Sequence, residues 1–226
     1  MNYAAAMKRH LEMLRDLRGP GRDAPERLAE VKDFQSRRLA AGYADVAAQA
    51  RYRSATAFFL EDLYGPKDFS ARDQEMLRIA PMMTRVLPAS AVETAALAIE
   101  LEALSEDLDQ RLARTLAPGP LDEAAYAEAY RASATRAERE RQIELIVAVG
   151  QRLDALVRKP LVLRTHQLKR QPARAAGLTD LQEFLERGFS SFRDMQGADA
   201  FLALIRERET EILSRLFSGA PRPFSL

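Results

Sequence analysis

The residues most able to do chemistry in this chain are charged or polar side chains that fall on the apolar faces of predicted helices. With each residue placed at 100° around a helical wheel, Glu100 and Asp107 project from one apolar face, because they lie two turns apart. Arg139 and Gln142 lie on the same apolar line as Ile146. The complete set of such residues, a candidate buried polar cluster, is Asp62, Glu100, Asp107, Arg139, Gln142, Arg208 and Glu209.

Two kinds of role suit this polar set. Interhelical ion pairs would fix the register of an alanine- and leucine-rich core, because buried charges need partners and arginine supplies them bidentately. Alternatively, the same side chains would bind a small molecule, or act as general acids and bases, in a pocket of the bundle core. A dinuclear metal site would need Glu-x-x-His motifs, whereas Met7 and Leu163 stand three positions before the histidines His10 and His166. We therefore expect no metal and no other cofactor.

The charges are segregated along the sequence, although the net charge is only +1. Residues 93–109 carry six acidic residues and no basic one, and residues 158–174 carry six lysines and arginines and no acid. In the acidic segment, Glu102, Glu106 and Asp109 fall on the polar face of the predicted helix, which we expect to be solvated. The basic segment would pack beside the acidic helix, or it would bind an anionic ligand or partner. Its candidate anion-binding residues are Arg158, Lys159, Arg164, His166, Lys169, Arg170 and Arg174.

The elements that must position these residues are helices. Alanine, leucine and arginine are abundant, whereas the β-branched residues that restrict χ1 in helices are sparse. Glycine and proline break the pattern at 19–21, 65–66 and 118–120. The apolar periodicity predicts helices over residues 2–18, 25–40, 44–64, 71–86, 91–116, 122–158, 161–170, 179–195 and 198–217.

These helices predict a compact, single-domain, all-α bundle of about eight or nine helices. The domain would span residues 1–218, and residues 219–226 would form an extended C-terminal tail. A hydroxyl residue followed three positions later by an acid, as in Ser70–Asp73 and Ser90–Glu93, predicts a capping box at a helix start. Asp122 and Thr179 are predicted single caps before helical runs.

The sequence also predicts the cellular location of the protein. The chain has no cysteine and shows no secretory signal pattern, and its apolar-rich run over 91–104 is interrupted by three glutamates. Its 34 basic and 33 acidic residues give no general attraction to nucleic acid or anionic membranes. We expect a cytoplasmic protein that does not associate with a membrane.

One segment resembles a known family signature. Phe58-Phe59-Leu60-Glu61-Asp62-Leu63-Tyr64 resembles the motif of a family of uncharacterised bacterial proteins, the FFLEELY-motif proteins, with aspartate in place of the second glutamate. Residues 172–189 are similar to the C-terminal half of the same family. The resemblance implies a bacterial origin and supplies no activity, because none is established for the family.

The sequence lacks the common catalytic motifs. It has no glycine-rich phosphate loop and no Gly-x-Ser-x-Gly elbow, and no histidine base lies near Ser190 and Ser191. This pattern favours a non-catalytic interaction or regulatory module, with a protein partner or a homodimer through an exposed patch near Phe189 and Phe192. The alternative is a small-molecule-binding protein or an enzyme that uses the polar cluster. A second alternative is nucleic-acid binding through residues 158–174, which the lack of stacking aromatics there disfavours.

Overall fold

The computed structural model describes residues 3–19, 24–63, 75, 79, 88–159 and 179–225. Within them the secondary structure consists of nine α-helices and one π-helical turn, with no strand, so the predicted all-α fold is confirmed. The helices are α1 (Tyr3–Arg18), α2 (Leu28–Gly42), α3 (Ala44–Ala47), α4 (Arg53–Phe58), α6 (Ala89–Thr115), α7 (Glu123–Ser133), α8 (Arg136–Val157), α11 (Thr179–Met195) and α12 (Asp199–Ser218), and the π-helical turn η1 is Phe59–Leu63.

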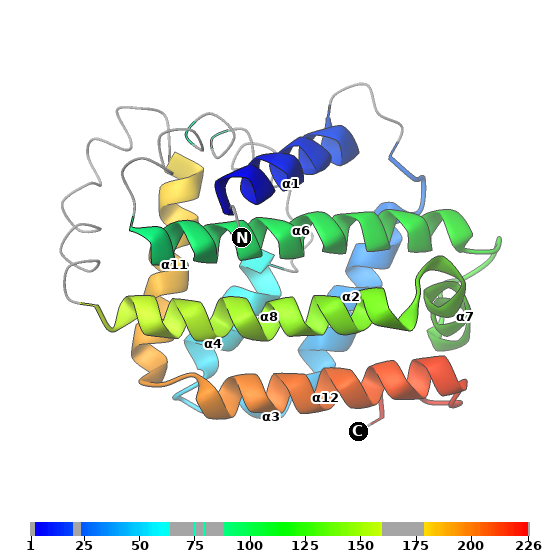
Figure 1. The fold of residues 1–226 in the computed structure, drawn as a ribbon. Coiled ribbons are helices and arrows are strands. Elements are labelled where there is room, and N and C mark those ends of the chain that lie inside the picture. The colour runs from blue at the N-terminus through cyan, green and yellow to red at the C-terminus, as the bar shows by residue number, and fades with distance from the viewer. Residues whose placement is uncertain are drawn as a thin grey trace.

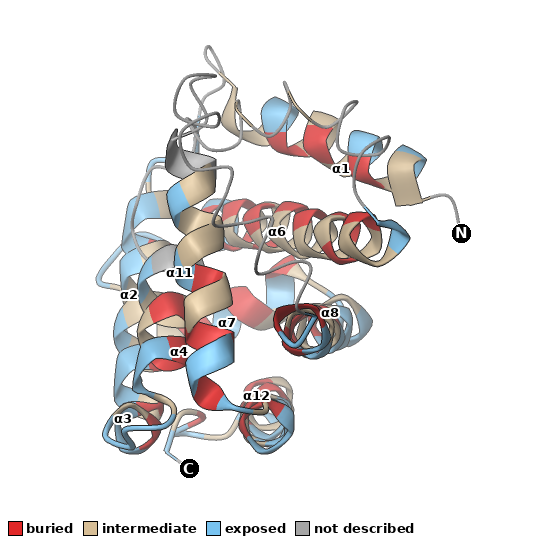
Figure 2. Cartoon of the chain, turned by 90° about the vertical axis from the view of Figure 1, so that its left-hand side faces the viewer, coloured by how far each residue is buried: buried red, intermediate tan, exposed pale blue. Residues whose placement is uncertain are grey.

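The helices form two layers. In the first, α6, α8 and α12 run side by side, and α1 packs along α6 at the edge (Figure 1). In the second, α2, α4 and α11 cross these helices, so that α6, α8 and α12 are seen end-on beside them when the molecule is turned (Figure 2). The short helix α7 packs against α6 and α12 at one end. Both α2–α6 and α8–α11 contacts join the layers.

Apolar side chains fill three clusters between these elements. Phe192, Met195 and Phe201 belong to a cluster that joins α11 and α12 to α4 and α8. A second cluster gathers at the α7 end of the molecule, and a third lies under α1. The polar site described below lies where the first two clusters meet.

Two predicted helices are interrupted. The predicted helix 122–158 is divided into α7 and α8, because Thr135 and Glu138 form a capping box that begins a new helix. Glu138 N donates to the Thr135 hydroxyl at 3.3 Å, and Thr135 N donates to the Glu138 carboxylate at 2.7 Å. The predicted helix 44–64 is divided into α3, α4 and η1. In the turn between α3 and α4, Arg51 donates to the carbonyl of Met195, which ties this turn to the end of α11.

The predicted caps had mixed outcomes. Asp122 caps α7 by accepting from the amide of Ala125 at 2.9 Å, as predicted. The capping box at Ser90 is wrong: α6 begins at Ala89 after Pro88, and the Glu93 carboxylate accepts from Tyr3 and Arg152 instead. The capping pair Ser70–Asp73, the helix 161–170 and nearly all of the helix 71–86 lie outside the described residues, as does the side chain of Thr179.

The segment after α12 begins with a glycine and returns toward α2 and α7. Gly219 adopts the left-handed conformation with φ 74°, which a residue without Cβ tolerates, and ends α12. Ser225 N then donates to Arg222 O at 3.3 Å in a turn. The Phe224 ring packs against the Phe34 ring in a tilted arrangement, with 5.9 Å between the ring centroids. Among the described helices, none combines the length and the apolar character that crossing a membrane requires.

Candidate functional site

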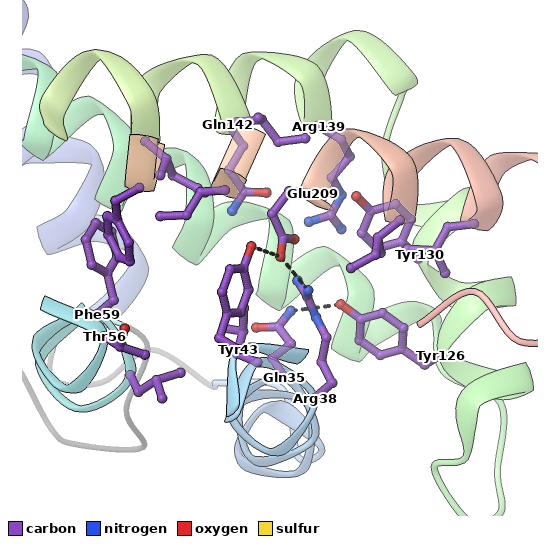
Figure 3. Close-up of a pocket in the computed structure, with 18 residues that line it drawn as sticks. Gln35, Arg38, Tyr43, Thr56, Phe59, Tyr126, Tyr130, Arg139, Gln142 and Glu209 are labelled. Atoms are coloured by element: carbon purple, nitrogen blue, oxygen red, sulfur yellow. Dashed lines mark hydrogen bonds and ion pairs between the residues drawn. The ribbon is translucent and has the colours of Figure 1, made fainter. Parts of the chain in front are cut away.

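A cavity of about 80 Å³ lies between the layers, where α2, α4, α8 and α12 meet (Figure 3). Its wall contains both polar and apolar residues. The polar residues that line it are Gln35, Arg38, Tyr43, Thr56, Tyr126, Tyr130, Arg139, Gln142 and Glu209. The apolar residues are Leu39, Phe59, Leu60, Ile143, Ile146, Phe201, Ile205, Ile212 and Leu216.

Among the described residues that line this cavity, Glu209 is the only carboxylate, and two partners hold it. It lies on the apolar face of α12 between Ile205 and Ile212, and its side chain is 12% exposed. Arg38 Nη1 and the Tyr43 hydroxyl both donate to Glu209 Oε1, at 2.9 Å and 3.0 Å. The Glu209 charge is therefore neutralised from α2 and the turn that follows it.

Burial and this carboxylate set the protonation of both donors. Burial disfavours the charged guanidinium of Arg38, but Glu209 outweighs burial and raises the pKa of Arg38 above its usual range. Burial, reinforced by the same carboxylate, raises the pKa of Tyr43. Arg38 therefore stays charged, and Tyr43 stays a neutral hydrogen-bond donor.

Arg139 is the second arginine of the wall, and its situation differs. It is 2% exposed, and its guanidinium carbon lies 4.1 Å from the centroid of the Tyr130 ring. Its Nε and Nη2 atoms are buried and have no hydrogen-bond partner among the described residues. Figure 3 shows the guanidinium pointing toward Glu209 and Arg38, but no ion pair forms within 4.0 Å. Arg139 is thus a buried cation whose edge is unused.

Behind the cavity wall, Gln35 links two further polar groups. Its amide nitrogen donates to Asp109 at 2.8 Å and to the Tyr126 hydroxyl at 3.2 Å. Burial raises the pKa of Asp109, although the positive charge of Arg139 works in the opposite direction. Asp109 therefore belongs to the shell around the cavity and not to the solvated face where the helical wheel places it.

The structure brings together three of the seven residues in the predicted polar cluster. Arg139, Gln142 and Glu209 line the cavity, and Gln142 also donates to the Ser105 hydroxyl at 2.8 Å. Arg208 immediately precedes Glu209 in the sequence but points outward, where it pairs with Asp45 at 2.7 Å.

The other predicted members lie elsewhere. Glu100 and Asp107 are not in the core cluster, because their side chains are 26% and 30% exposed and pair with Arg141 and Arg111 at the edge of α6. The side chain of Asp62 lies outside the described residues. Glu106, predicted to be solvated, is 2% exposed instead and pairs with Arg18 and Lys32. Helical periodicity predicted a solvated polar face for α6, but α1 and α2 cover part of that face.

This chain matches the model of one protein family. A family model described as Domain of unknown function (DUF8198) matches residues 15–223, which include every residue that lines the cavity. The chain belongs to this family. No curated protein and no solved structure gave a significant match.

The basic stretch of this DUF8198 chain is described only at its beginning. Arg158 pairs with Asp154 at 2.6 Å, and Lys159 donates to the Ser90 hydroxyl at 3.3 Å. The remaining candidate anion-binding residues, Arg164, His166, Lys169, Arg170 and Arg174, lie outside the described residues. Phe192 is 1% exposed and Phe189 packs on the same cluster, so these two rings do not form an exposed patch.

Several residues of the DUF8198 cavity were missed by sequence reasoning. Gln35 and Arg38 stand four and seven positions after Val31, the spacing of one helical face, so their inward direction was readable from the sequence. Tyr126 and Tyr130 have the same four-residue spacing. No group of three histidine, aspartate or glutamate side chains within the described ranges is placed to hold a metal ion.

Proposed function

We propose that this DUF8198 protein is a non-catalytic, small-molecule-binding module whose core cavity holds a small anion. The observation that carries the proposal is the buried cation of Arg139, which lines a partly open cavity and whose Nε and Nη2 atoms have no hydrogen-bond partner among the described residues. A buried charge without a partner costs several kcal/mol of stability, so Arg139 is a poor choice for a purely structural core position. A bound anion would supply the missing partner.

The charges around the cavity support an anion over a cation. Two arginines line it against one carboxylate, and Glu209 is already held by Arg38 and Tyr43. Asp109 does not approach Arg139 within ion-pair distance, and its hydrogen bond comes from Gln35. Arg139 therefore keeps donors without a hydrogen-bond partner next to the cavity, although its charge attracts the Asp109 carboxylate.

The segment that resembles the FFLEELY signature fits this proposal, because it builds part of the wall. Phe59 and Leu60 line the cavity, and the Phe59 ring packs on Phe201 with 5.7 Å between centroids. A signature at a ligand site is expected where a family shares its ligand. We keep the expectation of a bacterial, cytoplasmic protein, in which ligand binding would serve regulation.

Replacing Arg139 with methionine tests the proposal. We expect small monovalent anions, offered as sodium formate, acetate and nitrate at constant ionic strength, to raise the Tm of the wild-type protein. At a hundredfold excess over Kd, binding contributes about 2.7 kcal/mol, which corresponds to roughly 5–10 °C for a chain of this size. R139M should lose this response. The ligand-free variant should unfold at least as high as wild type, because an unpaired buried charge has been removed.

Arg141, on the same helix but 47% exposed, provides the matched control. R141M should keep the anion response unchanged. The proposal would be abandoned if no anion raised the Tm, or if R139M responded as wild type does. A loss of about 3 kcal/mol or more in ligand-free R139M would assign Arg139 a structural role instead.

A further inference from the structure

We infer that the ligand of the cavity is a short-chain aliphatic monocarboxylate, with its carboxylate at Arg139 and its alkyl chain toward Phe59. This inference rests on the proposed function and names the chemistry of its ligand. It follows from the positions of Arg139 and Phe59, which lie at opposite ends of the cavity wall. In Figure 3, Arg139 and Tyr130 lie on one side of Glu209, and Thr56 and Phe59 lie on the other.

The polar end suits one negative charge. Arg139 and Arg38 both have a buried donor without a partner among the described residues, but the charge of Arg38 is already paired with Glu209, whereas Arg139 has no carboxylate within ion-pair distance. A guanidinium edge matches the two oxygens of a carboxylate bidentately. A dianion such as sulfate or hydrogen phosphate would bring a second charge beside the Glu209 carboxylate without a second free cation to neutralise it. The site therefore favours monoanions.

The other end suits an alkyl chain. Phe59, Ile146, Phe201 and Ile205 line it, and Phe201 and Ile205 are 2% and 6% exposed. The Thr56 hydroxyl at this end already donates to the Tyr52 carbonyl at 2.9 Å. A water molecule there would find few partners, whereas methylene groups would gain from leaving water. This end argues against a purely inorganic anion such as nitrate.

The size of the cavity limits the chain length. Its volume of about 80 Å³ is roughly half that of an engineered cavity of about 150 Å³ that holds benzene. By proportion, a ligand of about three or four heavy atoms fits the unchanged cavity, which covers formate and acetate, and longer chains require the apolar wall to move. Hexanoate would exceed the space without rearrangement of the apolar wall.

Calorimetric titration of the wild-type protein with formate, acetate, propionate, butyrate and hexanoate tests the inference, with nitrate, sulfate and propionamide as comparison ligands. We expect affinity to rise about two- to fourfold from formate to acetate, and to fall for butyrate and hexanoate, which exceed the space. Propionamide, which has the same shape without the charge, should bind at least tenfold more weakly than propionate.

Variants at the apolar end should change the preferred chain length of the ligand. A purely structural role of these residues would leave that preference unchanged. I205A enlarges this end and should shift the preferred chain length upward by one or two carbons. I205V removes a single methylene group and keeps the fold if I205A does not, and it should shift the preference in the same direction by a smaller amount. The opposite change, I146F, fills part of this end and should shift the preference toward formate.

The titration results distinguish this inference from the proposed anion-binding function on which it rests. Chain-length dependence that shifts in I205A or I205V and disappears in R139M supports the inference. Binding of nitrate and formate that depends on Arg139 but shows no gain with chain length would overturn the inference and leave the anion-binding function standing. Failure of every anion to bind would overturn both.

Discussion

At the residue scale, this core contains buried charges in two different electrostatic situations. Glu106 is 2% exposed and is neutralised by Arg18 at 2.8 Å and Lys32 at 2.9 Å, with Gln110 donating at 3.1 Å. Arg139 is equally buried, but part of its guanidinium has no partner. A compensated charge contributes to stability, whereas an uncompensated one opposes it unless a ligand supplies the counter-charge. This contrast assigns Glu106 to the fold and Arg139 to the site.

Glu106→Gln should lower the stability of the protein at neutral pH by about 2 kcal/mol, because two cations lose their counter-charge. Burial would raise the pKa of Glu106, but the charges of Arg18 and Lys32 outweigh it and hold the pKa below the usual 4.5. The stabilisation is therefore complete above about pH 4.5 and is lost as the pH falls through the lower folded-state pKa.

Urea denaturation of wild type and E106Q across this range measures the effect. Their difference in unfolding free energy should shrink toward zero in acid. Glu12, which is 46% exposed and pairs with Lys8 at 3.8 Å, is the surface control, and E12Q should change stability by less than about 0.5 kcal/mol. A pH-independent difference between wild type and E106Q would contradict the assignment.

At the scale of the elements, the position of α12 against α8 determines where Glu209 and Arg139 meet. Gly150 lies on α8 at this contact, and a Cβ built on it would lie 2.4 Å from Leu202 Cδ2 and 3.0 Å from Cδ1. Leu202 is 2% exposed, so its side chain has little room to move away. The glycine therefore permits the close approach of α8 and α12 that builds one side of the cavity.

Gly150→Ala should destabilise the protein by about 1–3 kcal/mol through overpacking, despite the higher helix propensity of alanine. Gly42 has no neighbour within 4 Å of an added Cβ, and G42A should be neutral or slightly stabilising. In a double-mutant cycle, L202V should relieve part of the cost of G150A. If G150A proves as stable as wild type, the close α8–α12 contact is not required.

At the scale of the whole molecule, the segment after α12 ties distant parts of the chain to the site. The Phe224 ring lies 5.9 Å from that of Phe34 on α2 and 5.7 Å from that of Tyr126 on α7. The Arg38 guanidinium carbon lies 5.6 Å from the same ring. Arg215 also donates to the carbonyl of Ser225 and so holds the segment in place. The outer side of the Arg38 and Tyr126 wall is thus covered by residues from the end of the described chain.

Phe224→Ala should lower the free energy of unfolding by about 2 kcal/mol, because three aromatic and cationic contacts are lost together. Amide hydrogen exchange should accelerate in α2 and α7 more than in α1, which lies away from Phe224. F224L keeps much of the buried apolar area and should retain part of the stability. Equal exchange rates in wild type and F224A would show that the segment does not hold these helices.

The sequence alone determined which segments are helical and which faces are apolar. The prediction of α11 over 179–195 matches the structure, and the cap at Asp122 is confirmed, because propensity, capping and periodicity depend on residues within a few positions. The break between α7 and α8 was also readable from Thr135 and Glu138, but the continuous apolar stripe around it masked the signal.

Tertiary structure alone decided which charges meet. Arg38 and Glu209 are 171 positions apart, and no periodicity within one helix indicates which neighbour covers its face. A helical wheel gave the same standing to Glu100 and Glu209, yet solvent reaches the first at the edge of α6 and a cavity encloses the second. Charge compensation depends on distances of a few ångströms between helices, because the attraction that stabilises a buried ion must be close enough to replace the water that it has lost.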